Sequence, residues 1–266
     1  FSRERREPAR QGGDRLADVW WLALGEDDVP TSADWLTALE REHLDSIRFT
    51  KRRNEYVTRR WTTKQAIAAV LEIDRSPVTL RRIEIRHRTS GAPYVHLDGQ
   101  PAAVDVSMSD RSGWAVCLVG PPGTMPSGTV GVDLEVVEPR TPGFVADYFT
   151  PSERAHVAGQ PAARHDELAN LIWSAKEAAL KVLQVGVRAD TRTVEVELGL
   201  DPRADGWAPM TVTGPDGPMP GWWRRAGVFL LTIAYAEQTE PPRPLGGSAE
   251  LDDATPRHSW VDQPRC

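Results

Sequence analysis

The sequence predicts an α+β protein made of two similar α/β halves related by a pseudo-twofold axis. In each half, we expect a long helix packed on a small, mainly antiparallel sheet. The prediction rests on an internal repeat at an offset of about 112 residues, in which residues 61–71 align with residues 173–183 and share five of eleven amino acids. A length of 266 residues with 40% hydrophobic amino acids is enough to bury a sizeable core.

Hydrophobic periodicity predicts the same order of elements in the two halves: a strand, a short helix, a long helix and then further strands. In the first half, these elements span residues 19–24, 32–47, 51–71, 83–86, 94–97, 104–107 and 114–119. In the second half, they span residues 129–136, 151–158, 164–183, 194–198, 210–212 and 229–234.

Composition divides the rest of the chain. An Arg-rich flexible arm covers residues 1–15, and a Gly- and Pro-rich linker, residues 121–128, joins an N-terminal half (16–120) to a C-terminal half (129–236). Residues 237–266 are rich in proline and acidic side chains, which predicts a disordered or loosely packed tail. We expect no chemistry in the arm or in the tail.

The charge distribution narrows the classes of partner. The net charge is −6, but residues 48–64 carry seven basic side chains and a single acidic one, Glu55. A basic segment on an acidic protein disfavours nucleic acid and suits a small phosphorylated ligand or an acidic protein partner, the alternative being a solvated helix face. The longest apolar stretch, residues 226–236, is too short to span a membrane, and two cysteines favour a reducing, cytoplasmic setting. P-loop, zincin and hydrolase motifs are missing from the sequence.

Asp133 and Glu135 are the first candidate site residues. They lie two positions apart in a predicted strand, so their side chains share one face, while Val132 and Leu134 point into a core. Adjacent carboxylates repel each other, and a hard divalent cation such as Mg²⁺ relieves that repulsion. The alternative is a half-exposed strand with a polar face.

Glu177 and Lys181 share a face of the second long helix with Trp173, because the three residues recur every four positions. A plain Glu–Lys salt bridge is the alternative. Three of the four lysines of the chain lie in the repeated helix segments, against 28 arginines overall, which indicates that lysine is selected there by position. The first-half positions aligned with the four candidate charges are Trp21, Ala23, Gln65 and Ala69. The candidate charges are therefore confined to the second half.

Three segments of the second half carry a family resemblance: residues 131–135 (GVDLE), 149–154 (FTPSER) and 173–181 (WSAKEAALK). In their order and spacing they resemble the phosphopantetheinyl transferases, specifically the pseudo-dimeric Sfp-type branch. The resemblance extends over residues 19–236, strongly in the second half and weakly in the first.

The resemblance implies transfer of the 4′-phosphopantetheine arm of coenzyme A to a serine of an apo acyl or peptidyl carrier protein, which releases 3′,5′-ADP. Fatty acid, polyketide and nonribosomal peptide synthesis use such carrier proteins. Coenzyme A is then the substrate and Mg²⁺ the cofactor, held by Asp133, Glu135 and Glu177. Glu177, or a water that it orients, takes the serine proton, and Lys181 contacts the phosphate. We expect a monomer that binds neither nucleic acid nor membrane.

The resemblance also implies contacts to the phosphates of coenzyme A from the basic segment that holds Arg48, Arg52 and Arg53. The family patterns Gly-Lys-Pro and Ser-His-Ser read Gly-Ala92-Pro and Ser107-Met108-Ser here, so two usual phosphate contacts are missing. We expect nearby arginines to compensate, and we include Ser107 in the same site. The candidates for that compensation are Arg86, Arg88 and Arg111.

The two departures also support a different interpretation, in which the protein is a catalytically idle relative that binds coenzyme A or a carrier protein as an interaction module. A third interpretation is a Mg²⁺-dependent enzyme acting on another nucleotide pyrophosphate. The transferase is favoured because the carboxylates and the Glu–Lys pair are intact, and an enzyme that had lost its activity is expected to lose those residues first.

Overall fold

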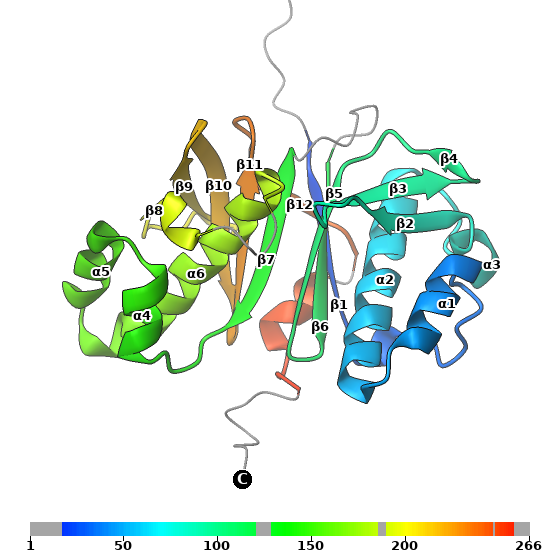
Figure 1. Ribbon diagram of the computed structural model, residues 1–266, viewed down its shortest axis with the longest axis horizontal. Coiled ribbons are helices and arrows are strands. Elements are labelled where there is room, and N and C mark those ends of the chain that lie inside the picture. Colours follow the sequence, from blue (N-terminus) through cyan, green and yellow to red (C-terminus); the bar gives the residue numbers. More distant parts are fainter. Residues whose placement is uncertain (1–17, 121–128, 186–189, 247, 258–266) are drawn as a thin grey trace, which may run out of the picture.

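The computed structural model describes residues 18–120, 129–185, 190–246 and 248–257 (Figure 1). The predicted arm and the predicted linker lie outside the described residues. Helices and strands are mixed along the chain, in agreement with the predicted α+β class. The two longest helices, α2 (Thr50–Val70) and α6 (His165–Val182), flank a central group of strands.

The first half contains two sheets instead of the single sheet that the sequence predicts. One has the order β12-β1-β6-β5, with antiparallel pairs except for the parallel β1–β12 pair. The other is antiparallel, with the order β2-β3-β4. The strands are β1 (Trp20–Gly25), β2 (Ile83–His87), β3 (Pro93–Leu97), β4 (Gln100–Pro101), β5 (Val106–Arg111), β6 (Trp114–Val119) and β12 (Arg243–Pro244). The helices besides α2 are η1 (Glu26–Asp28), α1 (Ala38–Ser46) and α3 (Pro77–Leu80).

The second half contains one antiparallel sheet with the order β7-β11-β10-β9-β8. Its strands are β7 (Val130–Val136), β8 (Glu195–Leu198), β9 (Ala208–Gly214), β10 (Gly217–Ala226) and β11 (Phe229–Tyr235). Its helices are α4 (Pro142–Tyr148), α5 (Pro151–Ala158), η2 (Ala162–Arg164), α6 and η4 (Thr191–Thr193). A last helix, η5 (Ser248–Asp253), follows β12.

Most predicted elements are present with similar bounds, and two differences have clear causes. The predicted helix over residues 32–47 begins only at Ala38, because Thr37 and Glu40 form a capping box that fixes the start of α1. The sequence did not predict β10, whose glycines and prolines are unusual in a strand. Among the described residues, no helix is both long and apolar enough to cross a membrane.

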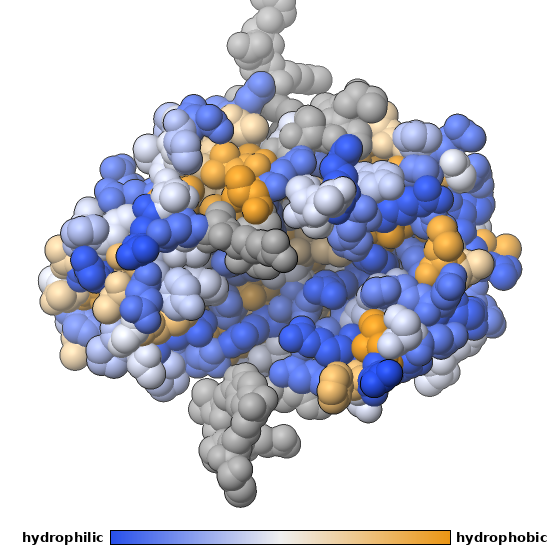
Figure 2. All heavy atoms as spheres, viewed as in Figure 1, coloured by the Kyte–Doolittle hydropathy of each residue, from blue (hydrophilic) through white to orange (hydrophobic). Residues whose placement is uncertain are grey.

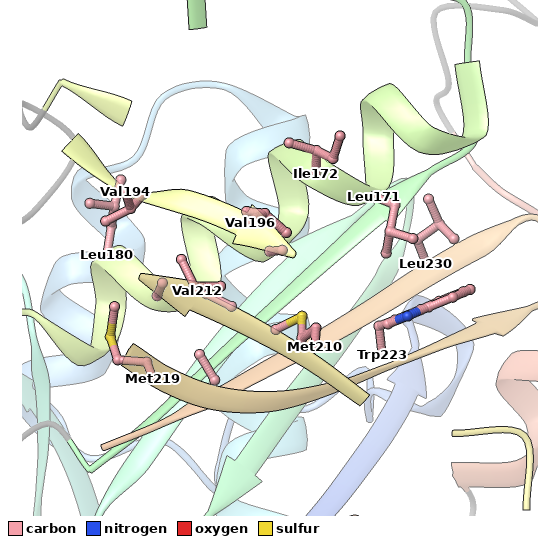
Figure 3. Packing of buried hydrophobic residues seen from close by; sticks show 14 of the residues in the cluster. Leu171, Ile172, Leu180, Val194, Val196, Met210, Val212, Met219, Trp223 and Leu230 are labelled. Carbon is pink, nitrogen blue, oxygen red and sulfur yellow. The ribbon is translucent and has the colours of Figure 1, made fainter. Parts of the chain in front are cut away.

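Hydrophobic side chains form three cores. One lies between α2 and the sheets of the first half, and another lies between α6 and the sheet of the second half. Figure 3 shows the second of these, where Leu171, Ile172 and Leu180 of α6 pack near Met210 and Val212 of β9. The third core joins the halves, because it contains residues of β1 and β6 together with residues of β7 and β11.

A buried ion pair anchors each long helix. Lys64 of α2 lies 2.5 Å from the Glu40 carboxylate and also donates to the carbonyl oxygens of Trp35 and Leu80. Lys176 of α6 lies 2.8 Å from the Glu153 carboxylate, and it also donates to two backbone carbonyl oxygens, those of Thr191 and Val194. Because these ammonium groups are fully paired inside the protein, two of the three lysines in the repeat have a structural role.

The described part of the tail is packed, which corrects the prediction of a disordered or loosely packed segment. The amides of Arg243 and Leu245 donate to carbonyl oxygens of Val19 and Trp21, which satisfies the open edge of β1. Leu251 of η5 is fully buried in the core that joins the halves. Although its composition is acidic and Pro-rich, this segment is held in place by one buried apolar side chain, that of Leu251.

Candidate active site

The site begins with the close approach of β7 and α6. Gly131 of β7 lies so near the helix that an added Cβ would come within 2.0 Å of the Ala178 carbonyl oxygen. Only glycine permits this distance without a shift of the backbone. The approach brings Asp133 of β7 next to Lys181 of α6, with 3.0 Å between the carboxylate and the ammonium.

A cavity of about 580 Å³ lies between the two halves and contains Glu177 and Lys181 in its wall. Its first-half wall comes from α1, α2, β2, the β2–β3 turn and β5, and its second-half wall comes from β7 and α6. In the view of Figure 2, hydrophilic residues cover most of the surface, including much of the region between the two long helices. A cavity of this size between two domains is typical of a small-molecule site.

Asp133 is almost fully buried, which excludes the alternative of a half-exposed polar strand. One carboxylate oxygen accepts hydrogen bonds from Ser109 and Lys181, and the other accepts one from Ser174 at 2.9 Å. Lys181 pairs with Asp133 across 3.0 Å, so its role is not that of a plain salt bridge along the helix with Glu177. Two serines that the sequence analysis did not single out thus hold the carboxylate in place.

Glu135 is also buried, and two hydrogen-bond donors and a further cation surround it. The indole of Trp173 donates to its carboxylate at 3.1 Å, and Arg111 and Arg140 lie at 3.2 Å and 3.4 Å. Burial first, and then the negative charge of Asp133, raise the pKa of Glu135 to about 7. Trp173 lies on the same helix face as Glu177, as predicted, and both residues line the cavity that contains Asp133 and Glu135.

Glu177 lies where two cavities meet. It lines the cavity between the halves and also a second cavity of about 530 Å³, whose wall includes Asp133, Glu135 and Trp173. Burial first, and then the charge of Asp133, raise the pKa of Glu177, while Lys181 lowers it. A carboxylate with a raised pKa is a better base near neutral pH than an ordinary one.

The three predicted metal ligands fit Mg²⁺ by their chemistry. Asp133, Glu135 and Glu177 are carboxylates that line one cavity, and Asp133 raises the pKa of each of the other two, so their negative charges act on one another. Hard oxygen donors of this kind are what Mg²⁺ prefers. Within the described ranges, however, no three or more His, Cys, Asp or Glu side chains are already arranged to hold a metal ion. Lys181 pairs with Asp133, and Arg111 and Arg140 pair with Glu135.

The structure brings only part of the predicted coenzyme A site to the cavity. Arg86 and Ser107 line it, and Ser107 also accepts a hydrogen bond from the amide of Val132 in β7. The other predicted arginines do not line it, so their contact with coenzyme A stays a prediction. These residues are Arg48, Arg52, Arg53, Arg88 and Arg111.

Four of these five arginines have partners elsewhere. Arg52 pairs with Glu55 on the exposed face of α2, and Arg53 donates to two carbonyl oxygens at the end of α1. Arg88 lies over the ring of Tyr94. Arg111 forms ion pairs with two carboxylates, one of which is Glu135.

Arg59 and Arg60 are cavity residues that the sequence analysis did not single out within the basic segment. They lie three and four positions after Tyr56, which also lines the cavity, and Arg52 lies four positions before Tyr56 on the same helix face. The helical period alone therefore does not separate them from Arg52. Arg59 pairs with Asp110 of β5 at 2.8 Å. Met108, one of the two departures from the family pattern, lines the same wall, as does Ala92.

Residues 129–205 match the model of the 4′-phosphopantetheinyl transferase superfamily. Over this segment, the chain is similar to members of that superfamily. The matched segment contains all the candidate metal ligands together with Lys181 and Gly131. The resemblance predicted from the sequence is therefore confirmed at the level of the superfamily.

Solved structures with similarity to part of this chain include two holo-acyl-carrier-protein synthases. One is from Bacillus anthracis in complex with coenzyme A (3′,5′-ADP), at 20% identity and a TM-score of 0.35, covering 41% of this chain and 100% of the other. The second is from Thermotoga maritima, at 20% identity and a TM-score of 0.32, covering 51% of this chain and 76% of the other. No curated protein matches the chain significantly.

Proposed function

We propose that the protein transfers the 4′-phosphopantetheine arm of coenzyme A to a serine of an apo acyl or peptidyl carrier protein. The observation that carries the proposal is the position of Glu177 and Lys181, one helical turn apart on α6, in the wall of a cavity between the halves. A candidate base and a candidate phosphate ligand thus face one space that is large enough for much of a nucleotide.

In the proposed reaction, the serine oxygen bonds to the phosphorus of the phosphopantetheine group, and the pyrophosphate P–O bond breaks. The leaving group is 3′,5′-ADP, and the serine proton goes to Glu177 or to a water that Glu177 orients. Phosphoryl transfer of this kind depends on positioning and on neutralised charge more than on covalent help from the protein.

Lys181 is suited to hold a phosphate. Its ammonium donates to the carbonyl oxygen of Val132 and to Asp133, which uses two of its three N–H groups. The third N–H group is then available to an anion in the cavity. Holding the ammonium by two fixed acceptors also orients it before the ligand arrives.

Asp133, Glu135 and Glu177 would hold Mg²⁺ at the junction of the two cavities. When bound, the ion neutralises negative charge on the pyrophosphate and on the leaving group. Ser109, Ser174 and the indole of Trp173 would then orient the carboxylates through the hydrogen bonds that they donate to Asp133 and Glu135.

The proposal extends to the architecture. The buried pairs Lys64–Glu40 and Lys176–Glu153 occupy aligned positions of the repeat, and in each of them the glutamate also belongs to the capping box of a short helix. This recurrence supports two halves related by a pseudo-twofold axis, as in the Sfp-type branch. We also expect a cytoplasmic monomer.

Intact-mass spectrometry tests the function. An apo acyl carrier protein incubated with coenzyme A, Mg²⁺ and this protein should gain the mass of one phosphopantetheine arm. A carrier in which alanine replaces the acceptor serine is the matched control and should gain nothing. Met108 and Ala92 in the cavity wall favour the second candidate, a module that binds coenzyme A without transfer. Binding of coenzyme A with no mass gain on any apo carrier would establish that candidate instead.

A further inference from the structure

Arg60 of α2 is a buried cation whose own contacts do not balance its charge. Only 6% of the residue is exposed, and it lies in the first-half wall of the cavity. One terminal nitrogen contacts the Met108 sulfur at 3.7 Å, and the other lies 3.5 Å from Nδ1 of His87. A thioether is a weak acceptor, and an imidazole nitrogen carries no negative charge. The buried Nε has no hydrogen-bond partner among the described residues.

The nearest carboxylate already has other donors. Glu40 lies 3.8 Å from Nε of Arg60, but it lies 2.5 Å from the ammonium of Lys64. It also accepts hydrogen bonds from the amides of Thr37 and Ile85. The Glu40 carboxylate therefore lies near two buried cations, and it is closer to the ammonium of Lys64 than to the guanidinium of Arg60.

The packing of the helix does not require an arginine at this position. The residue aligned with Arg60 in the repeat is Ile172, which lies in the hydrophobic core of the second half. Arg60 instead lies over the ring of Tyr56, with 4.8 Å between the guanidinium carbon and the ring centre. Burying an arginine without a full counter-charge costs free energy, so a ligand that supplies the missing charge would recover that cost on binding.

The surroundings of Arg60 favour an anion. Arg59 lies next to it in the same wall, where it pairs with Asp110, and Arg86 lines the cavity from β2, where it pairs with Glu84. Desolvation, and then the positive charges of Arg60 and Arg59, lower the pKa of His87, so the ring stays neutral beside the guanidinium. The flat, forked guanidinium group matches the oxygens of a phosphate better than an ammonium group does.

We propose that Arg60 binds a phosphate group of the ligand in this cavity, with the Met108 thioether as the weak contact that the phosphate oxygen replaces. The inference rests on the proposed function, in that the ligand is taken to be coenzyme A. The phosphate is either the 3′-phosphate or part of the pyrophosphate, and the two sources are separated by experiment.

Calorimetry of coenzyme A binding, without Mg²⁺ or carrier protein, tests the inference with the variants Arg60→Met, Arg60→Lys and Arg82→Met. Arg82 is a matched control because it forms an exposed ion pair with Asp98, outside the cavity. Losing a charge-assisted contact should weaken binding by about 10- to 100-fold in Arg60→Met, less in Arg60→Lys, and not in Arg82→Met.

A repeat with 3′-dephospho-coenzyme A assigns the phosphate. The effect of Arg60→Met should disappear with this ligand if Arg60 binds the 3′-phosphate, and it should persist if Arg60 binds the pyrophosphate. Wild-type affinity of Arg60→Met for coenzyme A would overturn the inference.

A second measurement uses the wild-type protein and does not depend on the folding of a variant. Inorganic pyrophosphate bound at Arg60 should raise the pKa of His87, followed by NMR of the ring, because the anion offsets the charge of Arg60. His43 and Arg59 also act on the pKa of His87, and both residues are present with and without pyrophosphate. An unchanged His87 pKa at saturating pyrophosphate would contradict the inference. If the wild-type protein fails to bind coenzyme A, the proposed function fails, and this titration still decides the role of Arg60.

Discussion

Lys176 lies 2.8 Å from the carboxylate of Glu153, and neither side chain is accessible to solvent by more than about 1%. Lys64 and Glu40 make the same pair in the first half. Each glutamate also accepts a hydrogen bond from a strand amide: Glu153 from Val196 of β8, and Glu40 from Ile85 of β2. The pairs therefore tie a short helix, a long helix and a strand together in each half.

Removing one member of either pair should strongly destabilise the protein, because its partner would stay buried without a counter-charge. Lys176→Met and Lys64→Met should each lower the free energy of unfolding by about 3–5 kcal/mol, measured by urea denaturation. The exposed Arg82–Asp98 pair is the control, and Arg82→Met should cost less than about 1 kcal/mol. Equal costs for the buried and exposed pairs would show that the buried pairs do not anchor the helices.

Ser174 should matter for metal affinity, because its hydroxyl donates to Asp133 and it also hydrogen-bonds to Thr232. Ser174→Ala should weaken Mg²⁺ binding by about 10- to 100-fold, measured by calorimetry in the presence of coenzyme A. Ser46→Ala is a control at an exposed hydroxyl that bonds only a helix carbonyl. Wild-type Mg²⁺ affinity in Ser174→Ala would contradict the assignment of Asp133 as a metal ligand.

The packed tail should contribute to the stability of the whole protein. Leu251 is fully buried where the two halves meet, so Leu251→Ala should cost about 2–5 kcal/mol of unfolding free energy. Its neighbour Asp252 pairs with Arg224 at the surface, and Asp252→Ala should cost less than about 1 kcal/mol. An unfolding midpoint of Leu251→Ala equal to that of the wild-type protein would mean that η5 is not part of the folded core.

The sequence predicted the second half of the site better than the first. The strand spacing of Asp133 and Glu135 and the helical spacing of Trp173 and Glu177 are local patterns, and the structure brings all four into the wall of one cavity. Such patterns can be predicted from the sequence, because the strand and helix periods decide which side chains share a face.

The first half was harder because a run of arginines does not show which of them face inward. Arg52 is exposed on α2, whereas Arg60 is buried two turns later on the same helix. Only the packing of α2 against β5 decides between them. The tail was misjudged for a similar reason, since one buried leucine, Leu251, outweighs the charged and proline-rich residues around it.

The central claim is that the cavity wall formed by Glu177 and Lys181 performs the transfer, and the rate of carrier modification by Glu177→Gln tests it most directly. Glutamine keeps the shape of the side chain but cannot accept the serine proton. The account predicts that the phosphopantetheine mass gain on an apo carrier slows by at least about 100-fold at saturating Mg²⁺, with coenzyme A affinity nearly unchanged. A wild-type rate in Glu177→Gln would contradict the account.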